Sequence, residues 1–282
     1  MINNSDYIEK SRETIKLALD EDIQNGDITT LAIVDEEKKC SGKLVAKESG
    51  IIAGLSVFAF VFKLLDEEGI EFNPNFEDGA EIKKGETIAE FSGKMRTVLS
   101  GERTALNFLQ RMSGVATKTK QYVNLLEGTK TELLDTRKTL PGFRHLDKYT
   151  VAVGGGKNHR IGLFDMVMLK ENHIKAAGSI ATAVQMIRDR YNSDFKIEVE
   201  TRNQTEIEEA IKSNVDVIML DNMSIEEMES AVKLIGGSAK IEASGNITVK
   251  NIRAVAETGV NYISVGAITH SVSALDISLL II

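Results

Sequence analysis

Basic side chains gather in one stretch of an otherwise acidic chain. The 282 residues include 34 basic and 42 acidic side chains, a net charge of −8. Between residues 137 and 175, eight Lys and Arg residues stand against three acids, so this stretch carries +5 and the remainder carries −13. Such a basic stretch favours a small anionic ligand, because a polyanion such as nucleic acid would be repelled by the rest of the surface. On charge count alone, a solvated basic face is the alternative.

The same stretch combines cations with flexible backbone. Four side chains offer forked or point donors for more than one carboxylate or phosphate group: Arg137, Lys138, Arg160 and Lys170. Three consecutive glycines, Gly154–Gly156, would let the backbone approach a ligand closely. Their spacing matches neither a dinucleotide-binding fingerprint nor a Walker A loop, so the chemistry rests on the cations.

Two carboxylates, Glu200 and Asp221, end successive apolar runs further along the chain. Carboxylates near a basic cluster are suited to hold Mg²⁺ for a phosphorylated ligand. A glycosidase also uses a carboxylate pair. A sugar site favours aromatic platforms, however, and this chain is only 5% aromatic and contains no Trp. The pattern therefore favours an anionic substrate over a neutral glycan.

These residues lie within a regular alternation of strand and helix patterns that begins at residue 131. The predicted strands are 131–136, 164–170, 195–200, 215–220, 239–244 and 261–266. Between the later strands, apolar residues three and four positions apart form one stripe per helix. Capping boxes are predicted at Thr205 with Glu208 and at Ser224 with Glu227. This alternation is typical of a parallel sheet, either doubly wound or a (β/α) barrel.

Polar residues at the strand ends favour the barrel. The residues that end or directly follow a predicted strand include Lys170, Glu200, Asp221, Ser244 and Gly266. In a barrel these ends converge on one mouth, whereas an open sheet spreads them along an edge. Side-chain parity agrees, because Glu198 shares one strand face with Glu200, and Glu242 shares another with Ser244.

The first hundred residues contain short alternating segments with turns, which predicts a separate N-terminal domain. The single cysteine, Cys40, excludes an internal disulfide and a multi-thiolate metal site, so any metal needs oxygen or histidine ligands. No apolar run approaches the roughly 20 residues of a membrane span, and the N-terminus lacks a signal-peptide pattern. We therefore expect a cytoplasmic protein with neither membrane nor nucleic-acid partners.

Six blocks, in this order and spacing, resemble the quinolinate phosphoribosyltransferases, the decarboxylating nicotinate-nucleotide pyrophosphorylases of NAD biosynthesis. They are LLDTRKTLPGFR (133–144), VGGGKNHRIGLFDMVMLKENHI (153–174), IEVE (197–200), MLDN (219–222), IEASGNIT (241–248) and ISVGAITHS (263–271). The likeness extends to ERTALNFLQRMSGVAT (102–117) and NGDITT (25–30), so it covers essentially the whole chain.

The resemblance implies a fold and a reaction. An N-terminal α/β sandwich-like domain would span 1–112, and an incomplete (β/α) barrel of mostly parallel strands would span 113–270, with a tail at 271–282 packed on the first domain. The implied protein is a homodimer or a larger homo-oligomer. It would join quinolinate to 5-phosphoribosyl-1-pyrophosphate with Mg²⁺, giving nicotinate mononucleotide, pyrophosphate and CO₂.

The resemblance also implies individual roles. Around the quinolinate carboxylates it places Arg137, Lys138, His159, Arg160 and Lys170, together with the partner subunit's Arg103, and it adds Thr136 to the substrate-binding set. Glu200 and Asp221 would serve the ribose hydroxyls and Mg²⁺, directly or through water. The ribosyl phosphate would lie against Ser244, Gly245, Asn246 and Gly266. The implied catalytic residues are Lys138, Lys170, Glu200 and Asp221.

Three alternatives share the implied fold. One is a phosphoribosyltransferase for nicotinate, which has one carboxylate fewer than quinolinate, and another is a relative linked to molybdenum transport. The third is an anion-binding module without turnover. The full basic set favours a dianionic substrate. Outside that set, His145, His173 and His270 are expected to be structural or supporting, and Lys148 and Lys157 to lie at the surface or on a phosphate.

Overall fold

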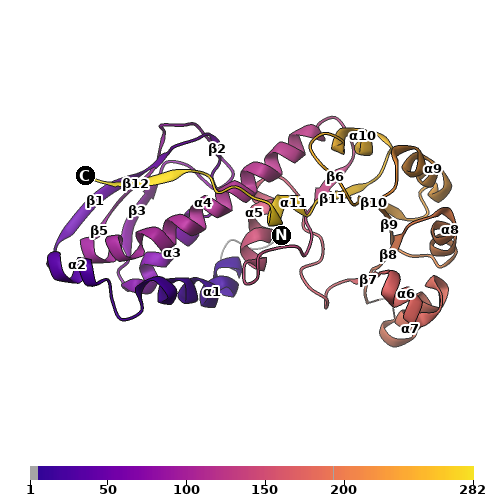
Figure 1. Cartoon of the computed structure of the whole chain (residues 1–282), viewed down its shortest axis with the longest axis horizontal. Helices are drawn as coiled ribbons and strands as arrows, with labels where there is room; N and C mark the ends of the chain where they lie inside the picture. The colour runs from indigo at the N-terminus through magenta and orange to yellow at the C-terminus, as the bar shows by residue number, and fades with distance from the viewer. Residues whose placement is uncertain (1–5, 193) are drawn as a thin grey trace. The chain divides into compact units, whose positions relative to one another are not determined.

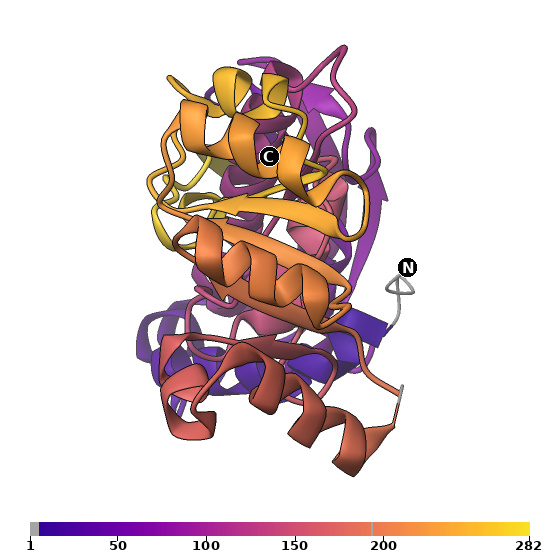
Figure 2. The same ribbon diagram turned by 90° about the vertical axis from the view of Figure 1, so that its right-hand side faces the viewer.

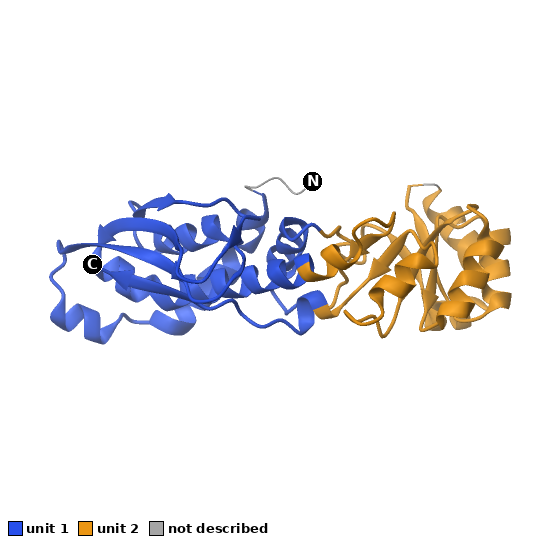
Figure 3. Cartoon of the chain, turned by 90° about the horizontal axis from the view of Figure 1, so that it is seen from above, with its two compact units in different colours: residues 1–120, 139–155, 268–282 blue, residues 121–138, 156–267 orange. Residues whose placement is uncertain are grey.

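The structure is a computed structural model that describes residues 6–192 and 194–282. It contains two compact units, which are coloured separately in Figure 3. Unit 1 comprises residues 1–120, 139–155 and 268–282, and unit 2 comprises residues 121–138 and 156–267. This division differs from the predicted domains because residues 113–120, 139–155 and 268–270 belong to unit 1. The first five residues of the predicted N-terminal domain lie outside the described residues.

Unit 1 is built on an antiparallel sheet with strand order β12-β1-β5-β3, and β2 pairs separately with β4 (Figure 1). Its strands are β1 (Lys39–Ala46), β2 (Gly50–Ile51), β3 (Ile70–Pro74), β4 (Glu81–Ile82), β5 (Thr87–Lys94) and β12 (Ile277–Ile281). Its helices are α1 (Asp6–Ile23), α2 (Ile28–Ile33), α3 (Leu55–Leu65), most of α4 (Met95–Leu125) and α5 (Arg144–Val153). The C-terminal tail therefore forms the edge strand beside β1.

The core of unit 1 depends on α3, which is almost entirely apolar and has one charged residue, Lys63. Phe58 and Phe62 of this helix are fully buried, with ring centroids 5.1 Å apart. Phe58 also lies 5.4 Å from the ring of Phe72 in β3. Aromatic side chains bury large apolar areas, so these contacts attach α3 firmly to the sheet.

Segment 139–155 joins unit 1 through α5. Tyr149 of α5 stacks on Tyr7 of α1 with ring centroids 3.7 Å apart, and its hydroxyl donates to Asp78 at 2.8 Å. Asp78 also accepts the backbone N–H groups of Gly54 and Leu55, at 2.9 and 3.1 Å, where α3 begins. Burial raises the pKa of both tyrosines, and the Asp78 carboxylate raises each further. One carboxylate thus connects the start of α3 to α5.

Unit 2 contains a six-stranded sheet with order β6-β11-β10-β9-β8-β7, in which every pair of neighbours is parallel. Its strands are β6 (Glu132–Leu134), β7 (Val167–Leu169), β8 (Ile197–Thr201), β9 (Val217–Asp221), β10 (Lys240–Ser244) and β11 (Tyr262–Ser264). Its helices are α6 (Glu171–Ala177), α7 (Ile180–Tyr191), α8 (Gln204–Lys212), α9 (Ile225–Ile235) and α10 (Ile252–Glu257), and α11 (Ala267–His270) begins at its last residue. Since β6 and β7 are its edges, the sheet is not closed, and the predicted incomplete barrel is confirmed.

Helices α7, α8 and α9 lie on one side of this sheet, as Figure 2 shows. Each helix buries part of the apolar stripe that its spacing predicts, through Ile180 and Val184 in α7, Ile207 and Ala210 in α8, and Met228 and Ile235 in α9. Within the described part of the chain, none of the helices combines the length and the apolar character that crossing a bilayer requires.

The two predicted capping boxes have different outcomes. Helix α9 begins as expected, because Ser224 Oγ accepts the Glu227 N–H at 3.2 Å and the Ser224 N–H donates to Glu227 Oε2 at 2.7 Å. The prediction for Thr205 is wrong. Asn203 caps α8 two positions earlier by accepting the Glu206 N–H at 3.0 Å, so Thr205 lies inside the helix.

Strand β7 is shorter than predicted at its start. Asp165 accepts the N–H groups of Ile161 and Gly162 at 2.7 and 3.1 Å, which closes a turn immediately before the strand. Phe164, which the prediction places in the strand, is 74% exposed in this turn. The strand therefore begins at Val167, where pairing with β8 starts.

We expect Gly114→Ala to destabilise unit 1, although alanine is the better helix former by about 1 kcal/mol. A Cβ added at Gly114 of α4 would lie 2.1 Å from the backbone oxygen of Ser273, which no rotamer change can move. The cost should be about 1–3 kcal/mol in unfolding free energy, as for other overpacked sites. Denaturant unfolding would measure it, with Lys120→Ala on the exposed surface of α4 as the control. Equal stability of the two variants would contradict this expectation.

Candidate active site

The carboxyl ends of the parallel strands in unit 2 carry polar residues. Asp135 follows β6, Lys170 follows β7, Glu200 and Asp221 lie at the ends of β8 and β9, Ser244 ends β10, and Gly266 comes shortly after β11. Because all the strands run in the same direction, these ends share one edge of the sheet. The register of β9 with β10 places Asp221 opposite Ser244.

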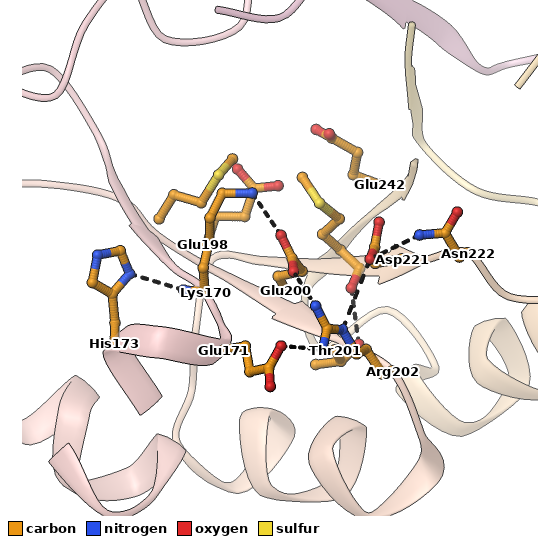
Figure 4. Close-up of polar contacts among 12 residues, drawn as sticks. Lys170, Glu171, His173, Glu198, Glu200, Thr201, Arg202, Asp221, Asn222 and Glu242 are labelled. Atoms are coloured by element: carbon orange, nitrogen blue, oxygen red, sulfur yellow. Dashed lines mark hydrogen bonds and ion pairs between the residues drawn. The ribbon is translucent and has the colours of Figure 1, made fainter. Parts of the chain in front are cut away.

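Glu200 holds two cations at this edge (Figure 4). Its Oε2 lies 2.6 Å from Lys170 Nζ, and its Oε1 lies 3.3 Å from an Nη of Arg202. The carboxylate is 9% exposed, whereas the Lys170 side chain is 48% exposed. A nearly buried carboxylate needs such partners, because an unpaired charge away from water is costly. The pair thus places Lys170 where a ligand at the strand ends can reach it.

Arg202 is a member of the cluster that sequence reasoning missed. Its guanidinium hydrogen-bonds Glu171, and its Nε lies 3.9 Å from Asp221 Oδ2. The hydrogen bond with Glu171 and the charge of that carboxylate raise the pKa of Arg202. The usable signal was its position directly after β8, the same signal that selected the other strand-end residues. Arg202 connects the carboxylates of Glu200 and Asp221 through one planar group.

The loops after β9 and β10 are hydrogen-bonded to each other. Asn222 and Asn246 both adopt left-handed backbone conformations, with φ of 58° and 52°. The Asn222 side chain donates to Asp221 at 3.0 Å and accepts from Asn246 Nδ2 at 2.9 Å. The backbone N–H of Asn222 donates to the Ser244 carbonyl at 2.9 Å. Gly245 has φ +91°, and a Cβ there would lie 2.2 Å from Asn222 Oδ1. The predicted residues Ser244, Gly245 and Asn246 are therefore brought together with Asp221, and Asn222 was missed although it lies in the MLDN block.

Asp135 fixes the backbone of the segment that leads to His159 and Arg160. It is fully buried, and its two oxygens accept the His159 N–H and Asn158 Nδ2, each at 2.8 Å. Backbone hydrogen bonds also connect this segment to the end of β6, between Lys157 and its partners Leu133 and Asp135. The segment therefore extends the sheet edge beside β6.

His159 contacts two buried carboxylates through one ring nitrogen. Its Nε2 lies 3.0 Å from Glu198 Oε2 and 3.4 Å from Glu242 Oε2, and its side chain is 7% exposed. The other ring nitrogen, Nδ1, accepts the backbone N–H of Arg160 at 2.7 Å. Glu198 and Glu242 are 0% and 1% exposed, and among the described residues the Oε1 of each has no hydrogen-bond partner. Sequence parity predicted the inward direction of these glutamates but not their pairing with His159.

Both pKa shifts in this cluster favour retention of a proton. Burial lowers the pKa of His159, but the hydrogen bonds with Glu198 and Glu242 outweigh it and raise that pKa to about 9. Burial raises the pKa of Glu198, against the opposing bond from His159, and the Glu242 carboxylate raises it further. Two adjacent buried carboxylates are costly to ionise together. Both shifts therefore have the contact between the His159 ring and the buried carboxylates among their causes.

The three ligand atoms of this cluster lie within 4.8 Å of one another, which is compatible with a metal ion. The Arg160 amide opposes that interpretation. Because Nδ1 accepts this N–H, a neutral ring carries its proton on Nε2. A protonated nitrogen cannot coordinate a metal, so the geometry is that of a hydrogen-bonded cluster.

Arg160 and Arg137 supply positive charge beside His159. The Arg160 side chain donates to the Met166 carbonyl at 3.1 Å. Burial lowers the pKa of Arg160, and the charge of Arg137 lowers it further, which places the two guanidinium groups within electrostatic reach of each other. Arg137 and Lys138 are exposed in the loop after β6, where the Lys138 N–H donates to Thr136 Oγ1 at 3.0 Å.

The remaining predicted residues have varied locations. Arg103 is an exposed residue of α4 in unit 1, whereas the other predicted site residues belong to unit 2. A Cβ at Gly154 would lie 2.6 Å from the Ala116 carbonyl oxygen, so the close approach at this glycine is to α4 and not to a ligand. Lys148 is fully buried in α5, so the expectation of a surface position is wrong.

Lys157 and the three other histidines lie in different local surroundings. Lys157 is exposed, with its Nζ 3.9 Å from Glu132. His173 Nδ1 accepts the Lys170 N–H at 3.0 Å, which supports the backbone at that position. His270 Nδ1 lies 2.7 Å from Ser271 Oγ, and burial lowers the pKa of His145.

The carboxylates at the strand ends fit Mg²⁺ as a cation shared with a ligand. Mg²⁺ is usually bound through one or two carboxylates together with substrate phosphates and waters. Glu200 and Asp221 provide such oxygens on the neighbouring strands β8 and β9. Both are paired with cationic or amide groups of the protein, so a metal ion would join or replace those partners.

Comparisons with known proteins identify the family of this chain. Models of the quinolinate phosphoribosyl transferase N-terminal and C-terminal domains match residues 27–113 and 115–280. A probable nicotinate-nucleotide pyrophosphorylase [carboxylating] of Bacillus subtilis is 45% identical, covering 92% of this chain and 89% of that protein. Quinolinate phosphoribosyltransferase [decarboxylating] 1b of Nicotiana tabacum is 42% identical, with 94% and 80% covered. The crystal structure of NadC from Streptococcus pyogenes superposes with a TM-score of 0.93 at 42% identity, covering 97% of this chain and 96% of the other. The chain belongs to the quinolinate phosphoribosyltransferase family.

Proposed function

We propose that this chain transfers the phosphoribosyl group of 5-phosphoribosyl-1-pyrophosphate to the ring nitrogen of quinolinate, giving nicotinate mononucleotide, pyrophosphate and CO₂. Its family membership supports this reaction. The observation that carries the proposal is the meeting of Lys170 with Glu200 at the strand ends, beside Arg202 and Asp221. A dianionic acid needs the cations, and a sugar that gains positive charge needs the carboxylates.

In this proposal, the cations around β6 and β7 bind quinolinate. Arg137, Lys138 and Lys170 are exposed, and Arg160 is half-buried beside them. Guanidinium groups bind planar carboxylates through paired N–H donors, and Lys adds a point charge. Two substrate carboxylates adjacent on one ring match a site with several cations converging from two strand ends.

The loops after β9, β10 and β11 bind the phosphoribosyl group in this proposal. Ser244, Gly245 and Asn246 form a hydrogen-bonded loop next to Asp221, and Gly266 lies on the neighbouring strand end. A glycine with positive φ brings backbone N–H groups close to a bound phosphate, as in other anion-binding loops. The carboxylates of Glu200 and Asp221 then lie on the side of the ribose hydroxyls.

The reaction breaks two bonds and makes two, a bond from the ring nitrogen to C1′ and, after CO₂ has left, a C–H bond. The bond between C1′ and the pyrophosphate oxygen breaks, and the quinolinate nitrogen bonds to C1′. Positive charge develops on the ribose ring meanwhile, and the nearby carboxylates of Glu200 and Asp221 stabilise it. Bound Mg²⁺ supplies charge stabilisation for the departing pyrophosphate.

Decarboxylation then uses the substrate itself. When CO₂ leaves the carbon next to the ring nitrogen, the electron pair of the broken C–C bond stays on that carbon. A proton then binds there and forms a C–H bond. The adjacent nitrogen is by then quaternised and positive, so it stabilises this charge without a separate organic cofactor. The cations that bind the remaining carboxylate keep the ring in place during this step.

We further propose that the functional form is a homodimer in which the partner subunit's Arg103 completes the quinolinate site. Arg103 is exposed on α4, in unit 1, whereas the remaining site residues are in unit 2. In a two-fold dimer such a contribution is reciprocal, so each chain supplies one Arg103 to the other.

We expect the protein to convert quinolinate and to require Mg²⁺ or Mn²⁺, while nicotinate does not replace quinolinate. Nicotinate lacks one carboxylate, so it would leave cations of the pocket unpaired at a cost of about 1–3 kcal/mol or more. The assay measures nicotinate mononucleotide and CO₂ with and without a chelator, and activity should return when the metal is restored. Comparable turnover of both acids would contradict quinolinate specificity.

The two sides of the site should respond differently to mutation. Arg160→Ala should weaken quinolinate binding at least about tenfold, because a charge-assisted hydrogen bond contributes roughly 1.5–3 kcal/mol. Asp221→Asn should leave quinolinate binding within about twofold and impair metal and phosphoribosyl use, since its own contacts are with Arg202 and Asn222. Asp221 is the better acidic residue for this test, because Glu200 is paired directly with Lys170. Calorimetric titration with quinolinate measures the affinity of each variant. Equal losses of quinolinate affinity in both variants would refute the separation of the site into a quinolinate side and a phosphoribosyl side.

Arg103→Ala and Lys138→Ala should each be nearly inactive but complement each other. If the two are unfolded together in equal amounts and refolded, about half of the dimers are mixed, and each mixed dimer has one complete site. Activity should therefore return to about a quarter of that of the unmutated protein. Native mass spectrometry would count the mixed dimers. If they form without any recovery, Arg103 does not act across the dimer.

A further inference from the structure

We infer that His159, held by Glu198 and Glu242, is a positioning residue that fixes Arg160 and does not itself bind quinolinate. This inference rests on the proposed function, in which Arg160 binds a quinolinate carboxylate. It departs from the role that the family resemblance implies for His159, which is a direct substrate contact.

Both ring nitrogens of His159 are already engaged within the protein. Nε2 is directed at Glu198 and Glu242, at 3.0 and 3.4 Å, and Nδ1 accepts the Arg160 N–H at 2.7 Å. The side chain is 7% exposed. For either nitrogen to donate to a substrate, an internal hydrogen bond would have to break in a buried setting, where its loss is costly.

Two successive backbone N–H groups are held by side chains in this segment. The His159 N–H donates to Asp135 Oδ1 at 2.8 Å, and the next N–H, that of Arg160, donates to the His159 ring. Asp135 is itself fully buried. The backbone that carries Arg160 is therefore held from two directions, one of which is the imidazole.

The two glutamates decide which way the imidazole faces. Only an unprotonated Nδ1 can accept the Arg160 N–H, so the ring proton belongs on Nε2, where the carboxylates accept it. A flipped ring would turn carbon atoms toward both the glutamates and the amide. The carboxylates raise the pKa of His159 and so favour a second ring proton, but that proton would lie on Nδ1 and face the Arg160 N–H, so the geometry favours a ring with one proton, on Nε2. Glu198 and Glu242 thus fix the ring, and the ring fixes the amide.

The far end of Arg160 is held as well. Its guanidinium donates to the Met166 carbonyl at 3.1 Å and lies 3.6 Å from Met168 Sδ. With backbone and side chain both held, the guanidinium is fixed before any substrate binds. Preorganised donors give tighter binding, because less conformational freedom is lost when the ligand arrives.

Nitrogen NMR of the histidine rings tests the geometry without any substrate. The chain contains four histidines, so a His159→Gln variant identifies the His159 signals. We expect the signals of an unprotonated Nδ1 and a protonated Nε2 at neutral pH. A ring protonated on Nδ1, or an unprotonated Nε2 that shifts when Zn²⁺ is added, would overturn the inference.

A double-mutant cycle tests the consequence for quinolinate. His159→Ala should weaken quinolinate binding by about tenfold or more in the unmutated background. In the Arg160→Ala background the same substitution should change affinity by less than about twofold, because its effect passes through Arg160. Additive losses would mean that His159 contacts quinolinate directly and would overturn the inference. If His159→Ala does not fold, Glu242→Gln takes its place in the cycle.

Two matched substitutions separate the amide contact from the glutamate contact. His159→Asn keeps an acceptor near the position of Nδ1, whereas His159→Gln keeps a donor toward the glutamates. We expect His159→Asn to bind quinolinate more tightly than His159→Gln and to raise the KM for quinolinate but not that for 5-phosphoribosyl-1-pyrophosphate. The reverse order, or equal changes in both KM values, would contradict positioning of Arg160. If the unmutated chain binds no quinolinate, the proposed function fails, while the NMR result still decides how His159 is held.

Discussion

Cations that converge on one ligand repel one another, so they stay together only where the protein supplies anions among them. At the strand ends of unit 2 this constraint is met by Glu200, a carboxylate that is 9% exposed and bonded to both Lys170 and Arg202. Arg202 extends the network to Glu171 and Asp221. Removal of this one carboxylate would leave two cations facing each other, so the arrangement of the site depends on it.

Burial sorts the charges of the site into two layers. Asp135, Glu198 and Glu242 are at most 1% exposed, whereas Arg137 and Lys138 are exposed. Asp135 accepts a hydrogen bond from the His159 N–H, and Glu198 and Glu242 face the His159 ring. This follows from strand parity, because alternate residues of β8 and β10 point away from the covering helices. The sheet therefore presents cations to a ligand and keeps the acids that position them beneath.

The alternating pattern predicted most of this fold, because parallel strands and their helices have different apolar periods. It predicted the strand ends as the site, and with them Lys170, Glu200 and Asp221. It could not predict features that depend on partners distant in sequence. The burial of Lys148, the packing of Gly154 against α4 and the cap of α8 at Asn203 are of this kind. Each is set by a neighbour or a competing residue that no period reveals.

The predicted site residues themselves show the same limit. Sequence selected His159 and Arg160 as adjacent basic residues, which makes them look equivalent. The structure separates them, because the His159 ring accepts the N–H of Arg160 and faces two glutamates that lie about forty and eighty positions away in the chain. Arg202 and Asn222 were missed for a related reason, since their roles lie in contacts across neighbouring strand ends.

Lys170 and Arg160 are held in different ways, and in the proposed reaction this difference has a consequence. Lys170 is held by an ion pair with Glu200, so a substrate carboxylate must compete with Glu200 for it. Arg160 is held through its backbone and through the Met166 carbonyl, neither of which carries a full charge. A carboxylate therefore meets no anionic competitor at those Arg160 contacts. The first substrate carboxylate to reach Lys170 would also release a Glu200 oxygen on the side assigned to the ribose and Mg²⁺. The negative charge of the quinolinate carboxylate thus takes the place of Glu200 beside Lys170, so Lys170 keeps an anionic partner when the substrate binds.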